Sequence, residues 1–269
     1  MVLERRCIIS LVKRHPIITF FVLTYVIAWV FLPFGSFGAF SPLIAALIVI
    51  PISQGLSGLK ELGLRMIRWR VRWYWYVVAI GLPLAVHLST VGLNVAAGVG
   101  IPPQGFTSIT GLLLLFAVRI VNPLDGPLGE DPGWRGFALP GLQGLGYSPL
   151  LATVVLAVLI SGWHLPLFFM GGGLPMPIVV TSILTTAAVT FWYTWIFNRT
   201  GGSVLLVILA HDLEGSIQAE GWVYMGLWVA VAIGLVVFDW KSWRAPAAPE
   251  TTTAPEAVPP REAAPATPA

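Results

Sequence analysis

Long apolar runs alternate with short polar stretches over the first 244 residues of the chain. A helix needs about 20 mostly apolar residues to cross the hydrocarbon core of a bilayer. We find no ten-residue pattern of alternating polarity that would indicate a barrel, and backbone groups in lipid must be satisfied internally, so we expect helices. The predicted spans are residues 17–34, 40–56, 73–97, 108–123, 148–169, 177–197, 203–217 and 222–238.

Basic residues gather in only a few of the polar stretches between these runs. With eight spans, all of these stretches fall on the same side as the N-terminus, whereas the first and third loops carry no charge. Positive charge marks the cytoplasmic side, so we expect both termini to be cytoplasmic in a multi-pass protein of the plasma or inner membrane. The residues concerned are Lys60, Arg65, Arg68, Arg70, Arg72, Arg199, Lys241 and Arg244.

Composition agrees with a lipid environment. Hydrophobic residues make up 57% of the 269 residues and charged residues 10%, with a net charge of +3, whereas soluble domains carry about 25% charged residues. The chain is therefore expected to interact with the lipid bilayer and not with nucleic acid. The single cysteine, Cys7, excludes an intrachain disulfide and a Cys-rich metal site.

The chain divides into two parts by composition. Residues 1–244 form the expected transmembrane domain. Residues 245–269 consist mainly of Ala, Pro, Thr and Glu, a composition that cannot bury a core. We expect this segment to be a disordered cytoplasmic tail, so any chemistry should reside in the first part.

Ionisable residues in apolar surroundings are costly and usually functional, and they occur in three segments. These are residues 129–140, 162–169 and 209–215. A carboxylate and an imidazole together can activate water for attack on a carbonyl, or can bind a metal that does so. We therefore expect an all-α polytopic protein with a membrane-embedded polar cavity. The residues concerned are Glu130, Asp131, Arg135, His164, His211, Asp212 and Glu214.

Spacing suggests separate roles within the first segment. Asp131 and Arg135 lie four residues apart, so on a continuous helix they share a face and can pair, while Glu130 points about a quarter-turn away. Alternatively, Pro132 begins a new helix with Asp131 as its N-cap, which leaves only Glu130 for catalysis.

Each segment also has a purely structural interpretation. The first can be an ion-paired loop at the cytoplasmic face. His164 can be a core histidine that bonds a backbone carbonyl near the break made by Pro166, and the third segment can be a polar helix end. At 1.5 Å per residue, His164 lies about 24 Å and His211 about 12 Å from the cytoplasmic starts of their helices. The catalytic hypothesis requires the three segments to converge in space. The sequence does not itself show that they do.

Taken together, the three segments resemble the motifs of one family. Residues 130–140, with their Gly-Trp-Arg-Gly core, resemble the Glu-Glu-x-x-x-Arg motif of the CAAX-protease and bacteriocin-processing (abortive-infection) family of intramembrane proteases. Trp163-His164-Leu165-Pro166 resembles its second motif, and residues 198–203 followed by His211 resemble its third. The resemblance covers roughly residues 57–238.

The resemblance implies specific roles for these residues. Glu130 would activate water, His164 and His211 would stabilise the oxyanion or orient the water, and Arg135 would hold the acidic pair. The family has been described both as glutamate-dependent, with no cofactor, and as a metalloprotease. In the second case a zinc ion would be bound by Glu130, His164 and His211.

Two departures from the family pattern affect this expectation. Asp131 stands where the family usually has Glu, and Gly215 stands where it usually has Asn, four residues after the histidine. Loss of one oxyanion donor costs a factor of about 10²–10³ in rate. Asp212 or Glu214 would have to replace it, although a carboxylate repels an oxyanion unless it is protonated or bound to metal.

Four functions are therefore compared. The leading one is an endopeptidase acting on membrane-associated or prenylated-type peptides or proteins. The alternatives are a zinc-dependent version of this protease, a catalytically weakened membrane scaffold or immunity partner, and a carrier that uses the buried ionisable groups as a proton or cation path.

Overall fold

A computed structural model describes residues 9–100, 108–124, 126–217, 219 and 221–244. Cys7 and the expected tail at 245–269 lie outside the described residues. Every regular element within the described ranges is a helix, and each of the eight predicted runs contains one, so the all-α prediction is confirmed. The helices are α2 (Pro16–Trp29), η1 (Leu32–Phe34), α3 (Ser41–Ser53), α4 (Gly55–Met66), α5 (Tyr74–Ala96), α6 (Ile109–Val121), α7 (Pro127–Gly133), η2 (Trp134–Ala138), α8 (Leu139–Gly144), α9 (Pro149–His164), η3 (Leu165–Gly172), α10 (Met176–Arg199), α11 (Val204–Ile217), α12 (Trp222–Phe238) and α13 (Trp240–Arg244).

Helix length and composition support a multi-pass membrane protein. Four helical stretches of the described chain are long and apolar enough to cross a bilayer: Pro16–Phe34, Tyr74–Ala96, Pro149–Gly172 and Met176–Arg199. Helices α3, α6 and α12 are apolar but shorter. Helix α11 is in neither group, and it is the helix that carries the third ionisable segment. Eight full crossings therefore stay a prediction.

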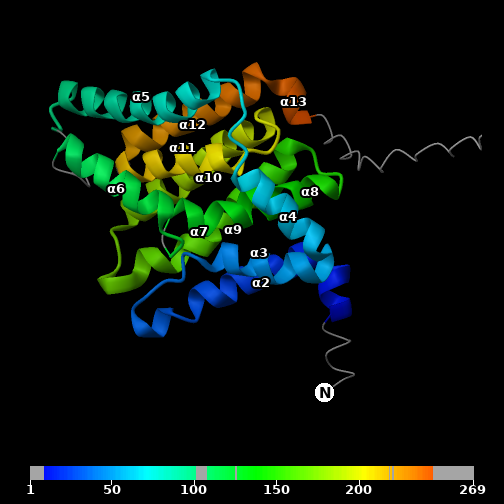
Figure 1. Ribbon diagram of the computed structural model, residues 1–269. Helices are drawn as coiled ribbons and strands as arrows, with labels where there is room; N and C mark the ends of the chain where they lie inside the picture. The colour runs from blue at the N-terminus through cyan, green and yellow to red at the C-terminus, as the bar shows by residue number, and fades with distance from the viewer. Residues whose placement is uncertain (1–8, 101–107, 125, 218, 220, 245–269) are drawn as a thin grey trace, which may run out of the picture.

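The packing of the helices brings the three ionisable segments to the middle of the molecule. Figure 1 shows α5, α12, α11 and α10 layered at one end, α2 and α3 at the other, and α7 and α9 between them. Helix α10 packs against α9 and α12, while α11 packs against α5, α6 and α7. Of the helices that carry the motifs, α9 and α11 pack against α10, and α11 also packs against α7.

The segment between the fourth and fifth predicted spans is a buried helix. Residues 127–144 run through α7, the π-helical segment η2 and α8 without a break. Asp131 and Pro132 lie inside α7, whose N-cap is Gly126, so the alternative in which Asp131 caps a new helix is wrong. Asp131 is also fully buried, so the interpretation as an ordinary ion-paired loop at the surface is wrong too.

Close packing against α3 holds α7 inside the protein. A Cβ atom at Gly133 would lie 2.4 Å from the carbonyl oxygen of Pro42 in α3, a distance that no side chain allows. Small residues permit such close approach between membrane helices. This contact therefore places the acidic pair of α7 at the depth of the bundle core.

Arg65, one of the basic residues expected only to orient the chain, has a structural role. It is buried on α4, and its Nη1 donates to the carbonyl of Gly136 at 3.1 Å. Pro140, four residues after Gly136, has no N–H to fill that acceptor. Arg65 thus supplies a donor to a buried carbonyl in a turn where Pro140 offers no N–H.

Replacing Arg65 should destabilise the protein. For Arg65→Ala we expect the free energy of unfolding to fall by about 1.5–3 kcal/mol, since a charged donor to a buried carbonyl is lost. Denaturant titration in detergent micelles measures this change. Lys60→Ala is the matched control, because Lys60 lies exposed on the same helix. Equal stability of the two variants would contradict the assigned role.

Candidate active site

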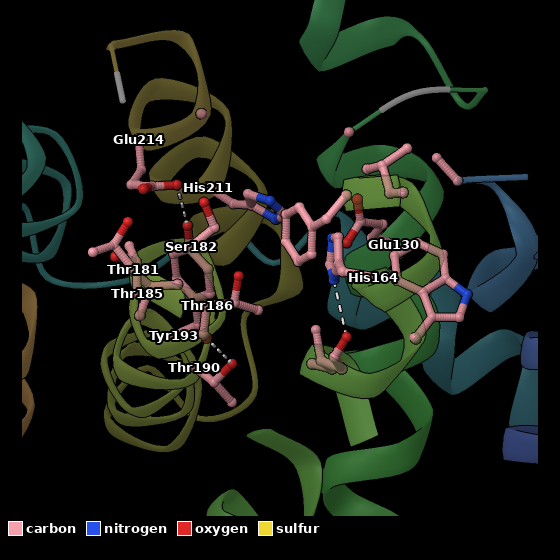
Figure 2. Close-up of a pocket in the computed structure, with 18 of the residues that line it drawn as sticks. Glu130, His164, Thr181, Ser182, Thr185, Thr186, Thr190, Tyr193, His211 and Glu214 are labelled. Atoms are coloured by element: carbon pink, nitrogen blue, oxygen red, sulfur yellow. Dashed lines mark hydrogen bonds between the residues drawn. The ribbon is translucent and has the colours of Figure 1, made fainter. Parts of the chain in front are cut away.

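All three ionisable segments contribute to one cavity of about 400 Å³. Glu130 reaches it from α7, His164 from the end of α9 and His211 from α11. In Figure 2, Glu130 and His164 lie on one side of the pocket, and His211 and Glu214 lie on the other. The convergence that the catalytic hypothesis requires is therefore present in the structure.

Hydroxyl groups of α10 make one wall of this cavity polar (Figure 2). Hydroxyls both donate and accept hydrogen bonds, so this wall suits a pocket that admits water between apolar helices. The residues are Thr181, Ser182, Thr185, Thr186 and Thr190.

Asp131 connects the arginine and the second histidine. Arg135 Nη1 donates to Asp131 Oδ1 at 2.9 Å, which confirms the pairing expected from their spacing. His211 Nδ1 donates to the other oxygen, Oδ2, also at 2.9 Å. A carboxylate that accepts from Nδ1 fixes the tautomer and orientation of an imidazole. Nε2 of His211 is therefore the nitrogen left for chemistry in the cavity.

Arg135 itself is held from two further directions. Its guanidinium lies 4.8 Å from the ring centroid of Tyr193, and its Nη2 donates to Thr190 Oγ1 at 3.5 Å. The side chain is 2% exposed, and a buried charge of this kind requires its counter-ion. Arg135 and Asp131 therefore stabilise each other, and Asp131 in turn holds His211 in position.

His164 is bonded at one nitrogen only. Its Nδ1 lies 2.9 Å from the carbonyl oxygen of Ile160, and a carbonyl can only accept, so Nδ1 carries the proton. Nε2 of the neutral ring is then an acceptor. The neighbouring Trp163 donates from Nε1 to Ser41 Oγ at 3.2 Å and fixes the end of α9. His164 therefore bonds a backbone carbonyl through Nδ1, as the structural interpretation expects. Its side chain also lines the cavity.

Asp212 and Glu214 have different surroundings. Glu214 lines the cavity, and its two oxygens accept from Tyr224 at 2.7 Å and from Tyr193 at 3.2 Å. Asp212 is fully buried and pairs with Arg119, with 3.4 Å between Nε and Oδ1. Glu214 accepts hydrogen bonds from two tyrosines and Asp212 is ion-paired with Arg119, so neither geometry resembles that of a neutral donor replacing Asn.

Comparison with known proteins supports the sequence resemblance. Residues 108–213 match the family model of the Rce1-like type II CAAX prenyl endopeptidases. The predicted family resemblance is confirmed. The matched segment contains Glu130, Asp131, Arg135, His164 and His211.

A curated relative gives the same result. The chain is 27% identical over 126 residues to the CAAX prenyl protease 2 of Methanococcus maripaludis. That alignment covers 42% of this chain and 46% of the relative, so it spans less than half of either protein. Both matches support a peptidase of the CAAX-protease type.

The residues present do not form a metal-ligand group. In the part of the chain that the structure describes, no three His, Cys, Asp or Glu side chains are placed to hold one metal ion. The zinc-binding set of Glu130, His164 and His211 and the metalloprotease prediction are therefore not supported.

Three residues of this site, Arg119, Tyr193 and Tyr224, were not predicted from the sequence. Arg119 was detectable as a lone charge in the apolar run 108–123, a pattern that marks functional positions in membrane helices. Tyr193 and Tyr224 gave no such signal, because aromatic residues are common in membrane helices. Their role appears only from their contacts with Glu214.

The hydrogen bonds from Tyr193 and Tyr224 to Glu214 should stabilise the fold. For Tyr224→Phe we expect the free energy of unfolding to fall by about 1–3 kcal/mol, because the buried Glu214 carboxylate loses its shorter hydrogen bond. Unfolding curves in detergent test this. Tyr147→Phe serves as the control, since Tyr147 is exposed, and a Tyr224→Phe variant as stable as that control would argue against the contact.

Proposed function

We propose that this chain is an intramembrane endopeptidase that hydrolyses peptide bonds of membrane-associated or prenylated-type substrates. The observation that carries the proposal is the meeting of Glu130, His164 and His211 in one cavity of a helical membrane protein. The relative is named a CAAX prenyl protease, and because less than half of its length is covered, the substrate class belongs to the proposal.

Glu130 and His164 are suited to activate water. Glu130 accepts a proton from a water molecule as the water oxygen bonds to the carbonyl carbon, and the electron pair of the C=O π bond moves to oxygen. His164, with Nδ1 bound to Ile160, offers Nε2 as an acceptor that orients this water. The proton held by Glu130 then passes to the leaving amine as the C–N bond breaks.

His211 is suited to act on the opposite side of the reacting carbonyl. Asp131 holds its Nδ1–H, and a ring protonated at both nitrogens would donate its Nε2–H to the developing oxyanion. Arg135 holds Asp131 in place. Arg135, Asp131 and His211 would thus form a chain of contacts in which only His211 touches the substrate.

We also propose an orientation for the chain in the membrane. The positions of the basic residues support a cytoplasmic location for both termini, so substrate would enter from the cytoplasmic side. The scaffold and carrier alternatives keep the same fold, and the assay below separates them from the peptidase.

Reconstitution of the full chain in liposomes tests the proposal. A farnesylated peptide with a free C-terminus and an unmodified membrane-anchored peptide serve as probes, and mass spectrometry detects new termini. We expect cleavage of at least one probe and dependence on Glu130. Absence of cleavage together with Glu130-dependent ion flux would favour the carrier, and absence of both would favour the scaffold.

A further inference from the structure

Arg119 occupies the space that a side chain at residue 215 would need. A Cβ atom at Gly215 would lie 2.9 Å from Nη2 and 3.6 Å from Cζ of Arg119. A Cβ atom at Gly126 would lie 3.1 Å from the same Nη2. The guanidinium therefore lies in a slot that exists because both neighbouring residues are glycines.

Arg119, Gly215 and Gly126 all line the cavity that contains Glu130 and His211. Gly215 follows His211 by four residues on α11, and residues four apart on a helix lie on one face with about 5–6 Å between Cβ positions. The guanidinium is thus placed beside His211, one turn further along the same face of α11.

Asp212 forms an ion pair with this guanidinium. Asp212 is fully buried, and its Oδ1 lies 3.4 Å from Nε of Arg119, whose side chain is 21% exposed. The contact is at Nε, while Nη2 is the atom that lies against Gly215. The guanidinium carries five N–H donors, so it can bind an oxygen in the cavity in addition to the partners that it already has.

We propose that Arg119 is a catalytic residue that donates a hydrogen bond to the oxyanion in place of the side chain that Gly215 lacks. This inference rests on the proposed peptidase function. As the water oxygen bonds to the carbonyl carbon, the former carbonyl oxygen gains the π electron pair, and Nη2–H of Arg119 and Nε2–H of His211 stabilise this charge with no transfer of their protons. A preorganised cationic donor of this kind acts mainly in the transition state.

Kinetics of Arg119→Ala test the inference in the reconstituted full chain, with the peptide that the wild type cleaves. We expect kcat to fall about 10²–10³-fold, with KM little changed, because the interaction forms only in the transition state. An unchanged kcat would overturn the inference. So would a raised KM with unchanged kcat, which would make Arg119 a ground-state anchor for a substrate carboxylate.

Rescue by Gly215→Asn gives a readout that a purely structural role would not produce. In the Arg119→Ala background the slot is empty, so an Asn at 215 has room and should restore part of the lost kcat through its amide N–H. In the wild-type background the same substitution meets Arg119 Nη2 and should lower kcat. Absence of rescue in the double variant would count against the oxyanion role.

Separate experimental controls distinguish a loss of folding from a loss of function. Arg119→Ala leaves Asp212 without this ion pair, so Arg119→Ala combined with Asp212→Asn is measured as a second variant with no added buried charge. It should show the same loss of kcat, and wild-type kcat in a folded protein would overturn the inference. Failure of the proposed function itself appears differently, as a wild type that does not cleave or that cleaves without dependence on Glu130.

Discussion

Glu130→Gln should reduce peptide cleavage by about 10²–10⁴-fold, the usual contribution of a positioned general base. Glutamine has nearly the same shape, so the buried packing around residue 130 should be preserved while the proton acceptor is lost. Initial rates in proteoliposomes measure the effect, and an unfolding curve confirms that the variant is folded.

Glu61→Gln provides the matched control for this substitution. It makes the same change from acid to amide on α4, where the Glu61 side chain is 44% exposed and not part of the cavity. We expect its cleavage rate to equal that of the wild type. A folded Glu130→Gln variant that cleaves as fast as Glu61→Gln would remove Glu130 from the mechanism.

Asp131→Asn should impair both stability and catalysis. The substitution leaves the guanidinium of Arg135, which is 2% exposed, without its buried counter-ion, and breaking such a pair costs about 3–5 kcal/mol. It also removes the carboxylate that orients His211. In a comparable carboxylate–histidine arrangement the amide variant loses about 10⁴-fold in kcat. Denaturant titration and steady-state kinetics measure the two effects separately.

A double-mutant cycle with His211→Ala separates the catalytic effect from the structural one. If Asp131 acts through His211, Asp131→Asn should change kcat little once His211 is absent, whereas its effect on stability should persist. Full additivity of the two losses in kcat would show that Asp131 does not act through His211.

The apolar pattern was sufficient to predict the eight main helices, because lipid-facing helices need long runs of apolar residues. It did not predict the helix at 127–144. Gly129, Pro132, Gly133 and Pro140 all have low helix propensity, and the segment carries three ionisable residues. Tertiary packing forms this helix, since the backbone of α3 fits only against a glycine at residue 133.

The chemistry of the site was predictable from residue types, but its geometry was not. The pairing of Asp131 with Arg135 followed from helical spacing. The estimated depths of His164 and His211 did not indicate convergence, because the residues around Glu130 were placed in a polar stretch outside the spans. Once 127–144 is buried in the bundle, Glu130 reaches both histidines from α7. Contacts between distant helices, such as those of Tyr193 with Glu214, leave no trace in local sequence patterns.

An experimental structure with a bound transition-state analogue tests the central claim most directly. A peptide in which a phosphinate replaces the cleaved bond presents a tetrahedral centre with two oxygens. We predict that the phosphinate binds in the 400 Å³ cavity with its oxygens about 3 Å from Glu130, His211 and Arg119. An analogue bound elsewhere, or bound without contact to Glu130 and His211, would contradict this account.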